Sequence, residues 1–347
     1  MGMNKLGLLF TAALLALPAD RALAWGATGH RLIGEAAAAA LPPDLPAFLR
    51  TPEAIADLGE LDREPDRWKG GKAGDLKTLD TTTHDTMRDP AHFLDLDDGG
   101  KVLGGPALAN LPATRAEYEK ALRAIGADGF HAGFLPYSIV DGWQQLVKDF
   151  AYWRVLTAAI PRERDPTRRA WLERDLVRRE HLILSDLGEW GHYVGDGSQP
   201  MHVSIHFNGW GASYPNPSGY TLDPVHAPFE GAFVRQYVAL KDVEAAMAPL
   251  QPCTAIWDCT EHYLATTNAS VVAFYEMQKA GGLNGPQPIK GRAFAIERIA
   301  AGASELRDLT VSAWEASANG TIGYPPLTVD QVVKRGVDPF DPLYGED

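Results

Sequence analysis

Histidine and carboxylate side chains recur at a spacing of four residues in two segments of the chain. His192 precedes Asp196, and His226 precedes Glu230, so on a helix each pair projects from one face. His202 follows Asp196 by six positions, which on a regular helix is a different face. Neutral imidazole and carboxylate oxygen are the ligand set that suits zinc. The spacing therefore favours a metal site.

The segment between the first pair and His202 contains residues that interrupt helices. Gly195 and Gly197 loosen a helix, and Pro200 ends or kinks it. Only such a break can turn His202 toward the preceding pair. We therefore predict two ligands on a helix and a third delivered by the turn that ends it.

Helix caps and surface ion pairs are the alternative for these residues, because single pairs with this spacing are common on helices. His30 and His92 join the candidate ligands, since each stands near a glycine or an acid. Spacing alone does not sort the acids Asp62, Asp66 and Asp95. The other histidines are interpreted as surface or capping residues, with two (His84 and His206) near enough in sequence to support the site: His84, His131, His181, His206 and His262.

The net charge of −13 limits the partners of the chain. It argues against a surface that coats nucleic acid or an anchor on anionic membranes. An anionic substrate would need a local positive centre, which bound metal ions can supply. The sequence also contains no nucleophile elbow, no phosphate-binding loop with Lys and Ser or Thr, and no dinucleotide-binding glycine pattern.

Residues 1–24 have the pattern of a signal peptide. Lys5 supplies the positive start, an apolar run follows to Leu17, and Ala22 to Ala24 form a small-residue cleavage site. The apolar run is too short to span a membrane, and no later segment is long and apolar enough. We expect a secreted or periplasmic protein that begins at Trp25, with residues 25–347 forming one domain.

Helical periodicity dominates the rest of the chain. Helices are expected over residues 31–41, 113–125, 137–160, 166–196, 226–247, 261–280 and 291–317. Residues 207–224 are rich in Gly, Pro and Asn and indicate an irregular loop. No alternating strand pattern was found, so the fold class is all-α, a helical bundle with long loops. Cys253 and Cys259 are expected to form a disulfide, with zinc binding as the alternative.

Several motifs between Trp25 and Glu230 match one family. The matching segments are Trp25 to His30, Asp66 to Lys69, His92 to Asp95, His192 to Asp196 with Gln199, Pro200 and His202, and His226 to Glu230. By these motifs the chain resembles the zinc-dependent phospholipase C and single-strand nuclease superfamily (the S-one/P-one type of nuclease). The resemblance implies an all-α fold with three zinc ions at the bottom of a cleft.

The resemblance also implies a ligand set for each ion. One zinc would use Asp66, His92, His192 and Asp196; a second the backbone of Trp25 with His30 and Asp196; the third His202, His226 and Glu230. Asp196 would bridge two ions, and the amine of Trp25 would have to be free. Asp66 would orient or deprotonate the attacking water, with Asp62 as the alternative upstream ligand.

A phosphodiester is the implied substrate, and its class stays open. We expect an endonuclease or 3′-nucleotidase acting on single-stranded nucleic acid. A phospholipase C acting on lipid headgroups is the alternative, and an exported metal-binding protein without catalysis is a third interpretation. Phe93, Asp95, Trp210 and Tyr214 would contact either a base or a headgroup. No obligate protein partner is evident.

Overall fold

The computed structural model describes residues 25–68, 88–286 and 288–345. The predicted signal peptide, Lys69 and His84 lie outside them. Helices make up most of the described chain, which confirms the all-α class. The α-helices are α1 (Gly26–Ala39), α2 (Pro52–Leu61), α3 (Glu64–Arg67), α5 (Arg115–Arg123), α6 (Gly129–Ala132), α7 (Leu135–Ala159), α8 (Pro166–Asp196), α9 (Val234–Tyr237), α10 (Leu240–Ala246), α11 (Ile256–Asn268), α12 (Val271–Lys279), α13 (Ile289–Ser317), α14 (Val329–Val333) and α15 (Phe340–Tyr344). Short 3-10 turns are η1 (Ala47–Arg50), η2 (Asp89–His92), η3 (Leu108–Asn110), η4 (Ile160–Arg162) and η5 (Pro200–His202), and η6 (Pro228–Phe233) is a π-helix.

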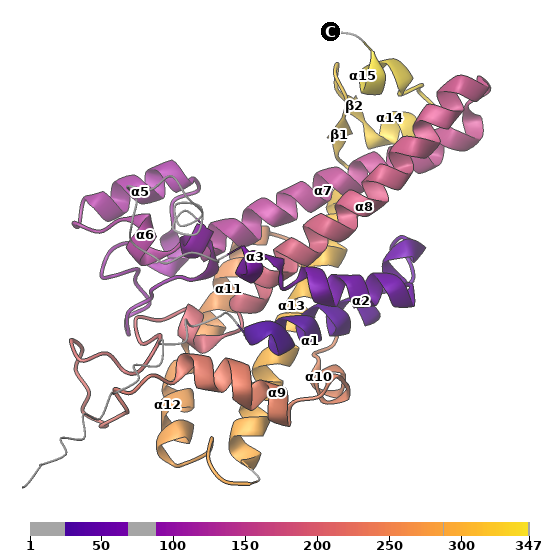
Figure 1. Ribbon diagram of the computed structural model, residues 1–347. Coiled ribbons are helices and arrows are strands. Elements are labelled where there is room, and N and C mark those ends of the chain that lie inside the picture. The colour runs from indigo at the N-terminus through magenta and orange to yellow at the C-terminus, as the bar shows by residue number, and fades with distance from the viewer. Residues whose placement is uncertain (1–24, 69–87, 287, 346–347) are drawn as a thin grey trace, which may run out of the picture.

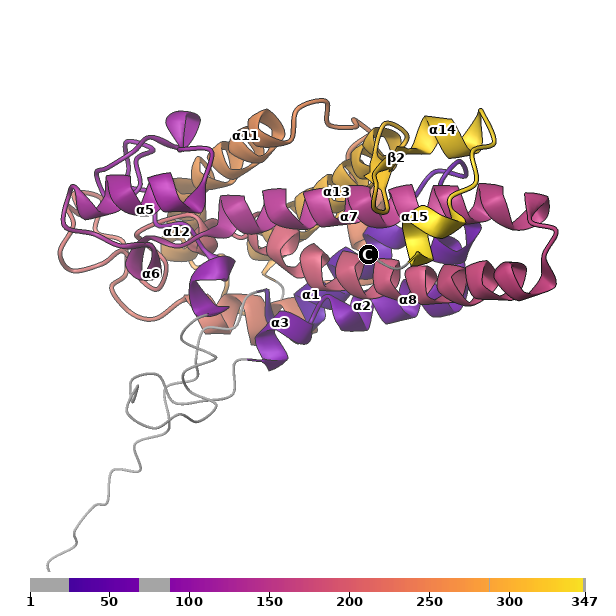
Figure 2. The same cartoon turned by 90° about the horizontal axis from the view of Figure 1, so that it is seen from above.

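The two long helices α7 and α8 pack side by side as a hairpin that reaches one end of the molecule (Figures 1 and 2). Asp165 caps α8, because its side chain accepts hydrogen bonds from the backbone N–H groups of Thr167 and Arg168. Pro166 occupies the first turn, where a missing N–H costs nothing. The last residue of α8 is the candidate ligand Asp196, so this carboxylate lies at the carboxyl end of the helix.

Helix α13 crosses behind this hairpin and packs against α1, α7, α8 and α10 (Figure 1). Its buried face, which includes Ile299, Ala303 and Leu309, belongs to the main hydrophobic core. Helices α1 and α2 pack against each other, and both also pack against α8. The core therefore fixes α1, α2 and α8 relative to one another.

Some predicted elements differ from the structure. The helix expected over residues 226–247 is broken into η6, α9 and α10, and the one over 261–280 is divided between α11 and α12 at Ala269 and Ser270. Two short strands, β1 (Thr321–Ile322) and β2 (Leu327–Thr328), pair antiparallel and were not predicted. With α14 and α15 they cover the end of α7 and α8 opposite to α5 and α6 (Figure 2).

Cys253 and Cys259 form the predicted disulfide. It joins the segment before α11 to the first turn of that helix. Among the described residues, no helix has both the length and the apolar character needed to cross a bilayer.

Candidate metal centre

Four side chains from three elements converge at the end of α8. His92 at the end of η2 places its Nδ1 atom 2.9 Å from His192 Nε2 and 3.1 Å from Asp196 Oδ2. His192 Nε2 lies 3.4 Å from Asp196 Oδ2 and 3.8 Å from Asp66 Oδ1, which comes from α3. In a tetrahedral zinc site with bonds of about 2.0–2.1 Å, neighbouring ligand atoms lie about 3.3 Å apart. The observed separations fit such a site.

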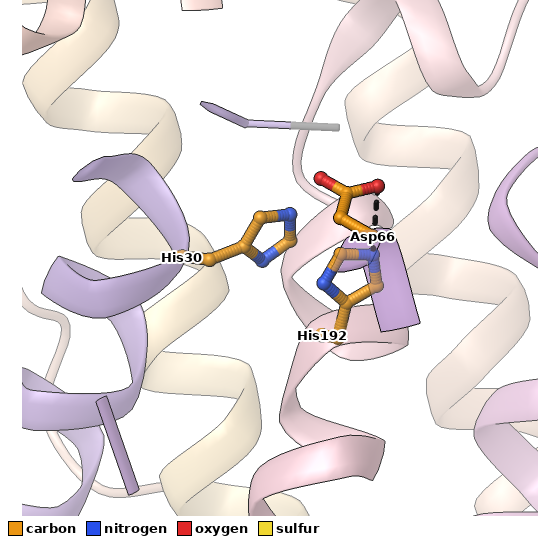
Figure 3. Close-up of side chains that lie close together, drawn as sticks. All are labelled: His30, Asp66 and His192. Atoms are coloured by element: carbon orange, nitrogen blue, oxygen red, sulfur yellow. Dashed lines mark ion pairs between the residues drawn. The ribbon is translucent and has the colours of Figure 1, made fainter. Parts of the chain in front are cut away.

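His30 from α1 approaches the same group from the other side. Its Nε2 atom lies 3.5 Å from Asp196 Oδ1, and its ring stacks on that of His192 at 3.8 Å between centroids. Figure 3 shows both rings pointing, with the Asp66 carboxylate, into one space. The two oxygens of Asp196 thus face different imidazoles, which is the arrangement expected of a carboxylate that bridges two ions.

Trp25 lies directly before α1 and is fully buried. Its indole N–H donates to Ser198 Oγ at 2.7 Å and to the carbonyl oxygen of Gly195 at 3.0 Å. These contacts hold the start of α1 against the end of α8. The role of the Trp25 amine and carbonyl as zinc ligands stays a prediction, because the preceding residues lie outside the described chain.

A second cluster consists of His202, His226 and Glu230. Their ligand atoms all lie within 4.8 Å of one another, and His226 Nε2 is 2.8 Å from Glu230 Oε2. The chain leaves α8 at Gly197, before Pro200, and η5 turns His202 toward this cluster. The break in the helix was predicted, but it comes three residues before the proline.

Hydrogen bonds from outside the ligand set orient the second cluster. His202 Nδ1 donates to the backbone oxygen of His92 at 2.7 Å, which directs its Nε2 atom away from that carbonyl. Gln199 Nε2 donates to Glu230 Oε2 at 3.2 Å. These contacts fix the ring of one predicted ligand and the carboxylate of another.

Asp62 and Asp66, the two alternatives left open by the sequence, occupy different positions relative to the candidate ligands. Asp66 faces His192 Nε2, whereas Asp62 accepts a hydrogen bond from His30 Nδ1 at 3.1 Å, on the far side of that ring. Asp62 is fully buried, and burial, reinforced by the charge of Asp66, raises its pKa well above the usual range. The geometry therefore favours Asp66 as the candidate ligand.

The donor set and its burial fit a cation. Imidazoles and carboxylates lie within hydrogen-bond distance of one another in an interior where charges are costly unless compensated. Zinc binds both kinds of ligand, and its attraction to the carboxylates is stronger in buried surroundings than in water. The described residues thus provide clusters able to bind metal, as predicted.

A pocket of about 440 Å³ opens onto this centre. It is lined by Asp89, His92, Phe93, Asp95, Phe130, His131, Met201, His202, Phe207 and His226. The position of Phe93 depends on a close contact with Gly133. A Cβ atom there would lie 1.9 Å from the Phe93 carbonyl oxygen, and the φ of +86° also favours glycine. Phe130, Met201 and Phe207 have no spacing relationship to the ligands, so the sequence did not reveal them.

Two predicted substrate contacts lie elsewhere. Trp210 is buried inside the loop 207–224, where it stacks on His206 and contacts Tyr275. Tyr214 packs edge-on against His206. Neither is among the residues that line the pocket: Trp210 packs inside the loop, and Tyr214 is exposed at 38%. His206 is itself buried between the Trp210 carbonyl and Asp98, which corrects its interpretation as a surface residue.

Asp95 remains a pocket residue with unusual electrostatics. Burial raises its pKa to about 7, and the nearby His131 opposes this shift. The carboxyl group therefore exchanges its proton near neutral pH. It can donate or accept a hydrogen bond to a bound molecule.

Comparisons with known proteins give limited similarity. No family model and no curated protein matches the chain. Among solved structures, the alpha-toxin of Clostridium perfringens, isolated from avian strain SWCP, aligns with 87% of this chain and 68% of its own at 14% identity, with a TM-score of 0.37.

Proposed function

We propose that the chain is a zinc-dependent phosphodiester hydrolase of the phospholipase C type. The observation that supports this most directly is the convergence of two clusters of buried histidines and carboxylates beside one pocket. Three zinc ions are proposed, with the ligand sets given above and Asp196 between two of them. The proposal includes export and removal of residues 1–24, because a free Trp25 amine is part of the second set.

Bound zinc would hold the phosphate, lower the pKa of a water molecule and stabilise charge on the departing oxygen. In hydrolysis the water oxygen bonds to phosphorus while the bond from phosphorus to the alcohol oxygen breaks. Asp66, whose side chain is 11% exposed, is the carboxylate proposed to orient that water and take its proton. Gln199 would hold Glu230 in place throughout.

The lining of the pocket favours a lipid headgroup over a nucleic acid strand. Among the described lining residues the charged groups are Asp89 and Asp95 with the histidines, and none is Lys or Arg. Proteins that bind nucleic acids usually contact several phosphates with basic side chains. Phe130 and Phe207 are about half exposed at the pocket, at 44% and 50%. An apolar rim suits the diacylglycerol of a phospholipid, and acidic walls suit a cationic headgroup.

A single-strand nuclease is the second candidate, supported by one pair of residues. Phe93 and Asp95 lie in the same pocket, two positions apart in sequence. An aromatic ring and a carboxyl that titrates near pH 7 can stack on a base and bind its edge. The sequence motifs favoured the nuclease, whereas the lining of the pocket favours the phospholipase.

A substrate panel with the chain from Trp25 onward tests the proposal. Short-chain phosphatidylcholine, a single-stranded DNA and a single-stranded RNA are each incubated with and without a chelator. We expect release of phosphocholine that the chelator abolishes and added zinc restores. A higher kcat/KM on either nucleic acid would overturn the phospholipase assignment and favour the nuclease.

The non-catalytic interpretation has its own outcome. If the zinc-loaded chain turns over none of these substrates, the centre is a binding site and the proposed hydrolase is wrong. Asp66→Asn is the matched variant, because it retains a ligand oxygen and loses the proton acceptor. When it is assayed with zinc in excess, so that the ion stays bound despite the weaker amide oxygen, its hydrolysis should fall at least 100-fold.

A further inference from the structure

Asp62 lies behind the metal centre, in contact with two of its candidate ligands. It directly follows α2 and is completely buried. Its Oδ1 atom accepts a hydrogen bond from His30 Nδ1 at 3.1 Å, and its backbone oxygen accepts one from His192 Nδ1 at 2.7 Å. A single residue thus contacts ligands on α1 and on α8, which are 162 positions apart in sequence.

The surrounding helices leave room for this carboxylate. A Cβ atom at Gly34 on α1 or at Gly191 on α8 would lie 3.1 Å from Asp62 Oδ2. A side chain at either position would press on the carboxylate. A cavity of about 10 Å³, lined in part by Asp62, Gly34 and Thr310, lies on the same side. The packing of α1, α2 and α8 therefore holds the Asp62 side chain in one place.

These contacts determine which imidazole nitrogen is available to a metal. A carbonyl oxygen only accepts, so Nδ1 carries the hydrogen in His192. Asp62 Oδ1 can accept from His30 Nδ1 whether the carboxyl group is ionised or holds its proton on Oδ2, so the same nitrogen carries the hydrogen there. The lone pair of each neutral ring then lies on Nε2. In both residues Nε2 is the atom that faces Asp196, at 3.5 Å for His30 and 3.4 Å for His192.

We propose that Asp62 is a positioning residue that fixes the tautomer and orientation of His30 and His192 for zinc. This inference rests on the proposed zinc centre. Carboxylates that hold the second nitrogen of a metal-binding histidine commonly contribute 10–100-fold in metal affinity. Asp62 reaches one ring through its side chain and the other through its backbone. Only the first contact is therefore open to substitution.

Zinc affinity of the variant Asp62→Ala tests the proposal. Competition with a chelating dye should show the tightest zinc ions bound about 10–100-fold more weakly than in the wild type. Asp62→Asn keeps an oxygen that can accept from His30 and should recover most of the affinity. Asp57→Ala removes an exposed carboxylate from the same helix and should change nothing. Wild-type affinity in Asp62→Ala would overturn the proposal.

A measurement on the unsubstituted protein covers the case in which Asp62→Ala does not fold. Nitrogen NMR of the metal-free chain with labelled histidine should show hydrogen on Nδ1 of both His30 and His192. Hydrogen on Nε2 of His30 would contradict the inference whatever the variants do. Neither readout involves phosphodiester turnover. Failure of the hydrolase assignment would therefore leave this result interpretable, and failure of the positioning role would not affect the substrate panel.

Discussion

At the scale of single residues, a spacing of four identified four of the candidate ligands. His192 with Asp196 and His226 with Glu230 are brought together as that spacing predicts, because each pair lies on one helical segment. The same spacing between Asp62 and Asp66 does not place the two side chains together. Helix α2 ends at Leu61 and α3 begins at Glu64, so the two acids do not share a helical face. Such a break between short helices is not visible in a pattern of residue types.

Asp196→Asn should remove two zinc ions from the chain. The two carboxylate oxygens face different imidazoles, Oδ2 toward His92 and His192 and Oδ1 toward His30, so one residue would serve two ions. An amide offers one weaker oxygen and no charge to either. Zinc per chain is measured by atomic emission after gel filtration.

Glu230→Gln is the matched comparison for that measurement. Glu230 belongs to the second cluster only, so its amide variant should lose a single ion. Equal losses from Asp196→Asn and Glu230→Gln would show that Asp196 does not bridge.

At the scale of elements, the reliability of a predicted helix depended on its capping signals. The range 166–196 agrees with α8 because Asp165 and Pro166 give a clear start. The range 226–247 contains no Gly or Pro at the position where α9 ends near Val238, and sequence gave no reason to break it there. No residue pattern indicated that η6 would be a π-helix. Strands of two residues are too short to show alternation, so β1 and β2 were missed.

The α7–α8 interface contains a carboxyl pair that makes stability depend on pH. Asp149 on α7 is 1% exposed and is hydrogen-bonded to Asp186 on α8, and Gln145 Nε2 donates to it at 3.1 Å. Burial first, and then Asp186, raise the pKa of Asp149 to about 7, against the opposing charge of Arg179. The folded chain holds this proton more tightly than the unfolded chain. Stability from this group is therefore full below about pH 4 and is lost as pH rises through about 7.

Asp149→Asn should remove this loss. The amide can donate to Asp186 and accept from Gln145, so it keeps both contacts without a second charge. At pH 8.5 we expect Tm to rise by about 2–4 °C over the wild type, and at pH 4 we expect no gain. Asp141→Asn, an exposed acid on the same helix, serves as the control and should show no gain that grows with pH. A gain for Asp149→Asn that is equal at both pH values would contradict the shared-proton explanation.

At the scale of the whole molecule, segments far apart in sequence meet at one end of α8. Helix α1, the α2–α3 junction, η2, η5 and η6 each bring at least one residue to the centre or to its support. Sequence patterns predict candidate metal ligands, but they do not predict which helices pack together. The packing of α1 and α2 on α8 depends on close contacts at glycines and on a shared hydrophobic core. The lining of the pocket is likewise a property of the assembled fold.

The proposed start of the mature chain at Trp25 provides a test at this scale. The Trp25 indole donates to Ser198 and Gly195, which flank the end of α8 that carries Asp196, so Trp25 is held beside the centre. A free amine there can bind a cation through its lone pair, whereas an amide nitrogen in a peptide bond cannot. A chain with extra residues before Trp25 should therefore bind one zinc ion fewer. Its hydrolytic activity should fall at least tenfold, a loss of about 1.4 kcal/mol in transition-state stabilisation. The same extension placed after Asp347 is the control, because that end is remote from the ligand set in sequence and should leave zinc content unchanged. A full complement of zinc in the amino-terminally extended chain would show that the centre is completed without the Trp25 amine.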